Sequence, residues 1–570
     1  MLIYEAKSEH DAWFKQASKS MGLGQAMGEY RKRYNRAPPP NFDEWYKYAT
    51  TRGSLIIDDF DSINDDLLPF WSLSPKEIRL RTWEMISNPW NEISGISIRN
   101  GEVQLSPNVL PTHRWMLDGV ASMIRNFAQF LPDMDLAFNL NDESRVAVPY
   151  EEMEKMRKAG RIAALTAATT TSNWSESRAE GWKPIPSSSL TTTRFVDSSF
   201  HNTFDTYGSI GCPPNSAART ARSWNTRDVC ISCLYPHTLG QFVQNWTLAS
   251  SPCHQPDLAR LHGFYLSPAA FKTTHDLMPV FSQSRPHPYA DILYPSAWNY
   301  IDKVIYDPTE LHPDPPFPEK GPDLFWRGAT SEGVSPGTGT WKGMTRQRLA
   351  HLSSNLTDAQ SVLLPTSSTN QGHPSQYRYV SLSPSDLASI LPPLNASIVS
   401  SIARCGGPDC SAQKAEFPFA QPIDFQAHWR HKYLFDVDGA GFSGRFLPFL
   451  QSRSLPFKSA LFREWYHHRL AAWMHFVPVD LRLGGVWSLL AYFEGVDGAA
   501  AAGAGKRIGK DISRVKWAGH EKEAMRIAEA GRYWSQKVVR KEDMEVYFFR
   551  LLLEWGRLTD DQREGLAFGA

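Results

Sequence analysis

The stretch HKYLFDVDGAGFSGRFLPFLQSRSLPFKSALFREWY, residues 431–466, gives the clearest structural signal in the chain. Its short aromatic and apolar run over residues 433–435 predicts a buried strand that ends at Asp436. Three glycines follow, at Gly439, Gly441 and Gly444. Glycines let a backbone turn tightly and approach a ligand, and a short helix is predicted from Arg445 onward. Such a strand, turn and helix start favour an anion-binding site, because unpaired amides and the helix dipole point into the turn.

The polar side chains of this turn suit a diphosphate. Ser443 supplies a hydroxyl donor and Arg445 a permanent bidentate cation. The glycine spacing G-x-G-x-x-G also matches the dinucleotide fingerprint, so a nicotinamide or flavin oxidoreductase is an alternative. That alternative requires an acidic residue after the next strand, residues 454–457, where this chain has Lys458. A glycine-rich turn without a ligand is a further alternative, in which Ser443 and Arg445 are ordinary cap and surface residues.

Length and charge bound the class of protein. A chain of 570 residues is too long for one core, and its 42% hydrophobic residues can build two or three domains. Sixty basic and sixty acidic residues cancel to a net charge of zero. No global field therefore favours nucleic acid or an anionic membrane, and any anion-binding site is local.

The sequence carries mixed signals about its compartment. It contains no run of about 18 apolar residues, and its first residues do not form a signal peptide. Asn-x-Ser/Thr sequons nevertheless occur at Asn173, Asn245, Asn355 and Asn395. Sequons are used only in the secretory pathway. A lumenal protein whose N-terminal membrane anchor is missing from this chain accounts for both observations.

The six cysteines support the same compartment. They group as Cys212, Cys230, Cys233 and Cys253, then Cys405 and Cys410. We expect three disulfides from these groups. The alternative is a zinc site in which Cys230 and Cys233 are joined by Cys212 and Cys253, or by His237 and His254.

The N-terminal half predicts a helical extension and then a sheet. Residues 1–115 are helical and aromatic in character, and residues 134–140 form an apolar run of strand length that leads to Asp142. Ligands collect beyond the carboxyl ends of parallel strands, which places Asp142 at such an edge, although an Asx-type turn is an alternative role. Residues 278–281 predict an edge strand, because Pro279 cannot donate a ladder hydrogen bond. Residues 291–295 predict another short strand.

The C-terminal half predicts a second sheet. The proline-rich residues 308–322 favour a linker. Residues 324–326 predict a strand that ends in Arg327, Gly328 and Ala329, and Arg346 begins a later helix. The arginines Arg327, Arg346 and Arg445 therefore become candidates to converge on one anion, while each alone is typical of a surface ion pair.

Three further segments complete the chain. Residues 166–193, rich in Ser and Thr, predict an exposed loop, and residues 499–505 a low-complexity insertion. Helices are predicted from Glu521 onward. The last has an apolar stripe at helical spacing, formed by Met544, Tyr547, Phe548, Leu551, Leu552 and Trp555. Such a stripe indicates core packing.

Several of these stretches resemble glycosyltransferase family 90, which contains fungal capsule-associated xylosyltransferase-like proteins and animal protein O-glucosyltransferases. The similar stretches are LPDMDLAFNLND (131–142), PVFSQSR (279–285), DILYPSAW (291–298), LFWRGAT (324–330), KYLFDVDGAGFSGRF (432–446), SLPFKSALFREW (454–465), WMHFVPV (473–479) and RKEDMEVYFFRLLLEW (540–555). They span most of residues 131–555 in order.

The resemblance implies an α/β, GT-B type fold of two facing Rossmann-like domains. The expected division is a helical N-terminal extension over residues 1–115, an acceptor-side domain over 116–310, and a nucleotide-sugar-binding domain with a closing C-terminal helix over 323–570. The implied reaction is an inverting transfer of xylose or glucose from a UDP-sugar to a hydroxyl of a glycan or glycoprotein, in the Golgi or endoplasmic reticulum lumen.

The resemblance also implies site residues. Asp142 matches the family's general base, which takes the acceptor proton during direct displacement. The implied nucleotide-sugar-binding residues are Arg327, Gly328, Ala329, Arg346, Asp438, Gly439, Ser443, Gly444 and Arg445. The acidic pair Asp436 and Asp438 departs from the animal members. It could bind Mn²⁺ or Mg²⁺, whereas GT-B enzymes usually act without a metal and acidic turn residues are often only solvated, so no metal is the favoured expectation. Residues 143–145 also differ, which leaves the acceptor open. A non-catalytic carbohydrate-binding relative on the same scaffold is the alternative from another class.

Overall fold

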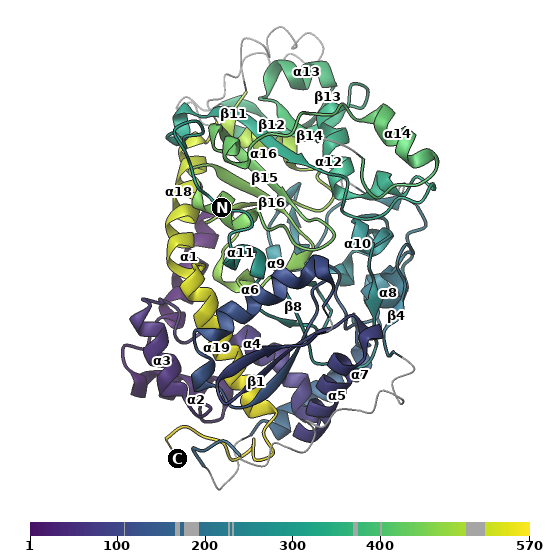
Figure 1. The fold of residues 1–570 in the computed structure, drawn as a ribbon. Coiled ribbons are helices and arrows are strands. Elements are labelled where there is room, and N and C mark those ends of the chain that lie inside the picture. Colours follow the sequence, from purple (N-terminus) through teal and green to yellow (C-terminus); the bar gives the residue numbers. More distant parts are fainter. Residues whose placement is uncertain are drawn as a thin grey trace.

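Figure 1 shows the computed structural model of the chain. It describes all residues except 108, 166–170, 176–192, 226–227, 231–232, 369–373, 400–401, 497–518 and 570, and no side chains over 365–376. The expected insertion over residues 499–505 lies wholly outside the described residues, and the expected loop over 166–193 lies largely outside them.

Helices form most of the N-terminal region. They are α1 (Leu2–Ala17), α2 (Leu23–Tyr34), α3 (Phe42–Thr51), α4 (Asp61–Leu67) and α5 (Pro75–Ser87). The start of α5 follows from local chemistry, because the Ser74 side chain accepts from the amide of Glu77 and Pro75 occupies the first turn. Helix α3 packs on the C-terminal helix α19 (Lys541–Leu558), where Trp45 donates to the carbonyl of Val546 at 3.0 Å.

The first sheet has five strands in the order β10-β8-β3-β1-β2. The strands are β1 (Ser94–Arg99), β2 (Glu102–Leu105), β3 (Met134–Phe138), β8 (Val280–Ser282) and β10 (Ile292–Leu293). Strands β3, β8 and β10 are parallel, whereas β1 and β2 pair antiparallel. The strands expected over residues 134–140 and 291–295 are therefore present, and β3 is buried along its whole length.

Two details of this sheet differ from the sequence expectation. Strands β1 and β2 fall within residues 1–115, which were expected to be helical. The expectation of an edge strand at residues 278–281 is wrong, because β8 lies between β3 and β10. Pro279 directly precedes the first residue of β8, so its missing N–H removes no hydrogen bond from the ladder.

The second sheet is entirely parallel, in the order β14-β11-β15-β16-β18. Its strands are β11 (Gly321–Gly328), β14 (Leu394–Ile398), β15 (His431–Val437), β16 (Leu455–Ser459) and β18 (Val477–Pro478). The predicted strands over residues 324–326, 433–435 and 454–457 are confirmed. Figure 1 shows β15 and β16 in the upper half of the view and β1 and β8 in the lower half. This mixed α/β arrangement with parallel strands is compatible with a Rossmann-like fold.

Helices cover the second sheet and connect it to the first. Around it lie α12 (Thr345–Ser354), α14 (Pro408–Glu416), α15 (Phe446–Gln451), α16 (Val486–Glu494) and α18 (Glu521–Val538). Helix α18 packs on α15, α16 and β16, whereas α19 joins the core of the first sheet. The six residues of the predicted apolar stripe on α19 are all buried, which confirms their core role.

Three disulfides confirm the expected pairing chemistry of the cysteines. They join Cys212 to Cys253, Cys230 to Cys233, and Cys405 to Cys410. The zinc alternative is therefore wrong for these residues, because a disulfide sulfur is not a thiolate ligand. Of the helices in the described ranges, none is both long and apolar enough to pass through a lipid bilayer.

Candidate functional site

The candidate site lies at the carboxyl ends of β11 and β15, two neighbouring strands of the second sheet whose following connections leave in opposite directions. From β11 the chain runs to β14 on one side, and it then returns to β15 on the other. The loops that follow neighbouring parallel strands therefore leave in opposite directions, and ligands of open α/β sheets bind in the crevice at this point. The loop after β11 begins at Ala329 and the loop after β15 begins at Asp438. Nearly all residues expected at the site are on, or next to, these two loops.

Arg346, in the first turn of α12, bridges the two loops. Its Nε donates to the carbonyl of Asp438 at 2.8 Å, and its Nη1 donates to the carbonyl of Ala329 and to Oγ of Ser331, both at 3.0 Å. Its backbone amide donates to Glu332 at 2.9 Å. Burial lowers the pKa of Arg346 although acidic neighbours oppose the shift. The guanidinium is therefore fixed at the edge of the sheet.

Arg445 reaches the same place from the loop after β15. Its Nη1 donates to the carbonyl of Arg327 at 2.7 Å, while its Nη2 is buried and makes no hydrogen bond within the described residues. Burial, with the charge of Arg346 adding to it, lowers the pKa of Arg445 to about 10, and Asp436 offsets this only in part. Two like charges held together under partial desolvation are costly, and a bound anion would relieve that cost.

The side chain of Arg327 lies elsewhere. Its Nη1 donates to the carbonyl of Asn395 at 2.7 Å, its Nη2 to Oδ1 of Asn395 at 2.8 Å, and its guanidinium lies 4.3 Å from the centre of the Phe325 ring. Successive side chains of a strand point to opposite faces, so position 327 follows Phe325 onto the face of Asn395. The structure thus brings Arg346 and Arg445 together, whereas Arg327 contributes its backbone carbonyl and anchors β14.

Two acidic side chains, Asp436 in β15 and Asp438 directly after it, accept hydrogen bonds from within the protein, although Oδ1 of Asp438 has no hydrogen-bond partner among the described residues. Asp436 is buried and accepts from Nζ of Lys458 at 2.8 Å and from the hydroxyl of Ser443. Oδ2 of Asp438 accepts from the amides of Leu461 at 2.6 Å and Phe462 at 3.2 Å. Among the described residues there is no group of three or more His, Cys, Asp or Glu side chains that could hold a metal ion. The arrangement therefore does not fit a Mn²⁺ or Mg²⁺ site at Asp436 and Asp438, and the Ser443 hydroxyl is already used as a donor.

The glycines of this turn serve close packing. None of Gly439, Gly441 and Gly444 has a positive φ, and the amide of Gly439 donates to the carbonyl of Gly441 at 2.8 Å. A Cβ at position 441 would lie 2.8 Å from the carbonyl oxygen of Asp142. The missing side chain lets the loop after β15 contact the loop after β3 of the other sheet. The carbonyl of Gly444 accepts from Asn299 at 3.1 Å.

Asp142 occupies the facing loop. Its side chain is exposed, although surrounding protein raises its pKa by desolvation, against the opposing charges of Arg404, His113 and Arg346. Exposure together with desolvation is typical of a carboxylate in a recess that solvent enters from one side. The next residue, Glu143, is buried and accepts from the amides at positions 269 and 270, both at 3.0 Å. Of the two adjacent carboxylates, Asp142 is the one that a ligand can reach.

A recess of about 260 Å³ is lined in part by Leu140 and Asn141, which directly precede Asp142. Its lining is mainly aliphatic and contains a few polar groups. The lining residues are Pro89, Glu92, Ile93, Ser94, Pro107, Val109, Leu110, Pro111, His113, Leu140 and Asn141. Residues 89–113 were not expected to contribute here, because the region containing β1 and β2 was expected to be helical. The same is true of Glu332, which accepts from the amides of Gly263 at 2.7 Å and Arg346. Its contacts join segments far apart in the sequence.

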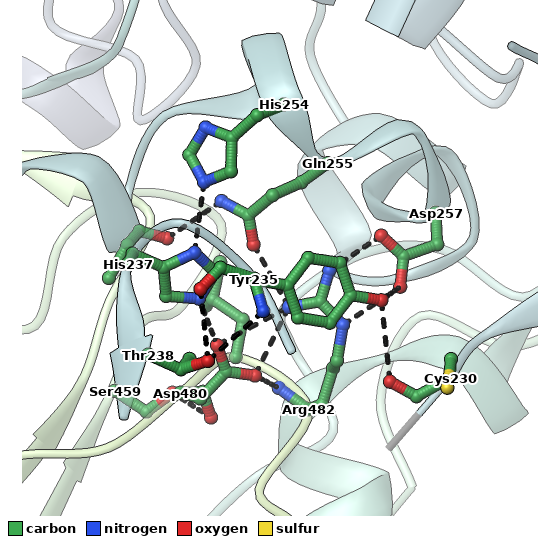
Figure 2. Close-up of polar contacts among 12 residues, drawn as sticks. Cys230, Tyr235, His237, Thr238, His254, Gln255, Asp257, Ser459, Asp480 and Arg482 are labelled. Carbon is green, nitrogen blue, oxygen red and sulfur yellow. Dashed lines mark hydrogen bonds and ion pairs between the residues drawn. The ribbon is translucent and has the colours of Figure 1, made fainter. Parts of the chain in front are cut away.

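A second polar cluster fastens the cysteine-containing segment to the second sheet (Figure 2). Arg482 donates from Nε to Asp257 at 2.8 Å and from Nη1 to Asp480 at 3.2 Å. His237 lies between Asp480, at 2.5 Å, and His254, at 2.9 Å. Burial lowers the pKa of His254 to about 4, so this histidine is neutral at pH 7. The cluster is a buried ion network that stabilises the fold, and we assign it no ligand.

Replacement of Arg482 by methionine is expected to lower the free energy of unfolding by about 3–5 kcal/mol, because Asp257 and Asp480 would remain buried with an unpaired charge. A urea titration monitored by tryptophan fluorescence would measure the loss. Arg31→Met, on an exposed position of α2, is the matched control and is expected to change stability by less than about 0.5 kcal/mol. Equal urea midpoints for the Arg482 variant and the wild type would show that the network does not stabilise the fold.

The fold and the site together define an α/β protein with two neighbouring arginines, Arg346 and Arg445, at the carboxyl edge of a parallel sheet. No model of a known protein family matches the chain. In sequence, the chain is 28% identical over 145 residues to an O-glucosyltransferase rumi homolog of Aedes aegypti. It is 26% identical over 142 residues to an O-glucosyltransferase rumi homolog of Anopheles gambiae. The matched segments cover 25% and 24% of this chain and 30% of each relative, so the chain spans less than a third of the relatives it matches.

Proposed function

We propose that the chain is an inverting glycosyltransferase that moves a sugar from a UDP-sugar to a hydroxyl group. The observation that carries this proposal is the pairing of Arg346 with Arg445, whose Nη2 has no partner within the described residues, opposite the reachable carboxylate of Asp142. The similarity to two O-glucosyltransferase homologs supports a sugar-transfer reaction. We further propose glucose or xylose as the sugar and a glycan or glycoprotein as the acceptor.

In the proposed reaction each group has one role. The acceptor oxygen forms a bond to C1 of the sugar as the bond from C1 to the diphosphate oxygen breaks, and UDP leaves with the bonding electrons. The acceptor proton passes to Asp142, whose raised pKa makes it a better base than an aspartate with the ordinary pKa. Arg346 and Arg445 stabilise the negative charge that develops on the departing UDP. No covalent intermediate is required.

We propose the same two-domain organisation that the resemblance implies, with a GT-B arrangement in which residues 116–310 and 323–570 face each other. The support is that Asp142 follows a strand of the first sheet and the two arginines belong to the second. We also propose a lumenal location in the secretory pathway. Three disulfides support it, because such bonds persist in oxidising compartments.

The first test is a calorimetric titration of the purified chain with UDP and, separately, with NAD. We expect UDP to bind and NAD not to bind, because Lys458 at the end of β16 pairs with Asp436 where a dinucleotide enzyme needs an acidic residue for the ribose. EDTA is expected to leave the UDP affinity unchanged, because the described residues contain no group of three or more His, Cys, Asp or Glu side chains that could hold a metal ion. UDP release from UDP-glucose or UDP-xylose then separates an enzyme from a carbohydrate-binding protein. A chain that binds NAD in preference to UDP would refute the proposal.

A further inference from the structure

Arg404 lies on a third segment that contacts the candidate site, in addition to the loops after β11 and β15. Arg404 comes shortly before α14, and the disulfide between Cys405 and Cys410 ties the next residue to the first turn of that helix. The carbonyl of Arg404 accepts from the amide of Ser335 at 2.9 Å, and the amide of Gly406 donates back to the carbonyl of Ser335 at 2.9 Å. These bonds hold this segment against the loop that follows β11.

The backbone of Arg404 has a left-handed conformation, with φ of 54°. This conformation is uncommon for a residue with a long side chain, and it persists where neighbouring bonds enforce it. Here the paired hydrogen bonds to Ser335 and the adjacent disulfide enforce it. The conformation sets the direction of the side chain, which is exposed.

The side chain of Arg404 reaches the residue that Arg346 also contacts. Nη1 of Arg404 donates to the carbonyl of Ser331 at 2.9 Å, and Nη1 of Arg346 donates to Oγ of the same serine at 3.0 Å. The two guanidinium groups therefore meet at Ser331. Among the charges that act on the pKa of Asp142, Arg404 is the strongest cation, ahead of His113 and Arg346.

We propose that Arg404 is a further binding residue for the phosphate-bearing part of the donor, and that donor binding makes Asp142 a stronger base by taking up the charge of Arg404. This inference rests on the proposed function of the site. In the empty site Arg404 stabilises the Asp142 carboxylate, which weakens it as a base. A diphosphate bound between Arg404 and Arg346 neutralises both cations. Asp142 then keeps the acidic Glu143 beside it without the charges of Arg404 and Arg346.

The coupling has a direct chemical consequence. The carboxylate becomes most basic only when the leaving group is in place, so proton removal from the acceptor depends on a loaded donor. The order of events follows from electrostatics alone and requires no movement of a loop. The sequence did not predict this role, because nothing in it shows that the charge of residue 404 acts on Asp142.

The test compares Arg404→Gln with the wild type, with Arg31→Gln on the exposed surface of α2 as the matched control for loss of one positive charge. We expect UDP affinity, measured by calorimetry, to fall at least about tenfold in Arg404→Gln, because a charge-assisted hydrogen bond is lost. Arg31→Gln is expected to retain wild-type affinity. Arg404→Lys keeps the charge and is expected to recover part of the loss.

The pH dependence of donor turnover supplies a readout that a purely structural role would not change. Removing a cation raises the pKa of a nearby carboxyl, so the acid limb of kcat/KM for the donor is expected to move to higher pH by about half a unit or more in Arg404→Gln. The acid limb of kcat is expected to move in the same direction, because the loaded enzyme loses the same positive charge near Asp142.

The outcomes separate this inference from the proposed function. If the wild type binds UDP while Arg404→Gln keeps the same affinity and the same pH profile, the role of Arg404 is refuted and the proposed function stands. If the wild type binds no UDP, both are refuted. A thermal unfolding midpoint close to that of the wild type would show that the variant is folded, as expected for an exposed side chain.

Discussion

Replacement of Asp142 by asparagine is expected to lower the rate of sugar transfer by about 10²–10⁴-fold while UDP still binds. The variant keeps the shape of the side chain and removes its ability to accept a proton. Donor affinity is expected to persist, because Arg346 and Arg445 are unchanged. The measurement pairs calorimetric titration with UDP and UDP release from UDP-glucose and UDP-xylose in the presence of simple glycoside acceptors.

The control for Asp142→Asn is Asp118→Asn. Asp118 is an exposed aspartate on α6 (Arg114–Arg125) that pairs with Arg114. It carries the same charge at a position without a proposed role, so its loss is expected to leave transfer unchanged. Transfer at the wild-type rate in Asp142→Asn would remove Asp142 as the base.

Replacement of Arg445 by alanine is expected to weaken UDP binding by about 100-fold or more. Charge-assisted hydrogen bonds contribute about 1.5–3 kcal/mol each, and a guanidinium can offer two to a phosphate. The same change is expected to alter the free energy of unfolding by less than about 1 kcal/mol, because the lost bond to the carbonyl of Arg327 is offset by relief of repulsion from Arg346. Calorimetry and urea denaturation on one preparation measure both quantities.

Arg327→Ala is the matched comparison for Arg445→Ala. Both variants remove an arginine from the edge of the second sheet, but the side chain of Arg327 is held by Asn395. Its loss is therefore expected to affect stability more than UDP affinity. Equal losses of UDP affinity in the two variants would contradict the assignment of different roles to Arg445, in UDP binding, and Arg327, in holding the sheet.

The strands of the second sheet could be predicted because parallel strands buried on both faces have short, continuous apolar runs. Residues 433–435 and 324–326 are of this kind. The hairpin of β1 and β2 was missed although its signal was present. Asn100 and Gly101 both have positive φ between the two strands, and this pair is the strongest short hairpin signal. The helical and aromatic surroundings obscured it.

The loops of the candidate site could be located from sequence, whereas their side-chain partners could not. Strand ends and glycines are local features, so the positions of Arg346, Arg445 and Asp142 at loop edges followed from the pattern. The partner of a charged side chain is set by packing between distant segments. Lys458 neutralises Asp436 because the two face each other in register on β16 and β15, and that contact removes the candidate metal ligand.

Gly441 determines the geometry of the proposed reaction in a way that side chains do not. Its contact with Asp142 is made by backbone atoms, so no change of rotamer can lengthen or shorten it. In a direct displacement the proton acceptor and the departing diphosphate lie on opposite sides of one sugar ring. The distance between the base and the diphosphate-binding residues must therefore match the thickness of that ring. Backbone contact makes the match insensitive to mutations in the surrounding side chains. It also means that any separation of the two sheets moves the proposed base away from Arg346 and Arg445, so a partly opened molecule would bind UDP without transferring the sugar.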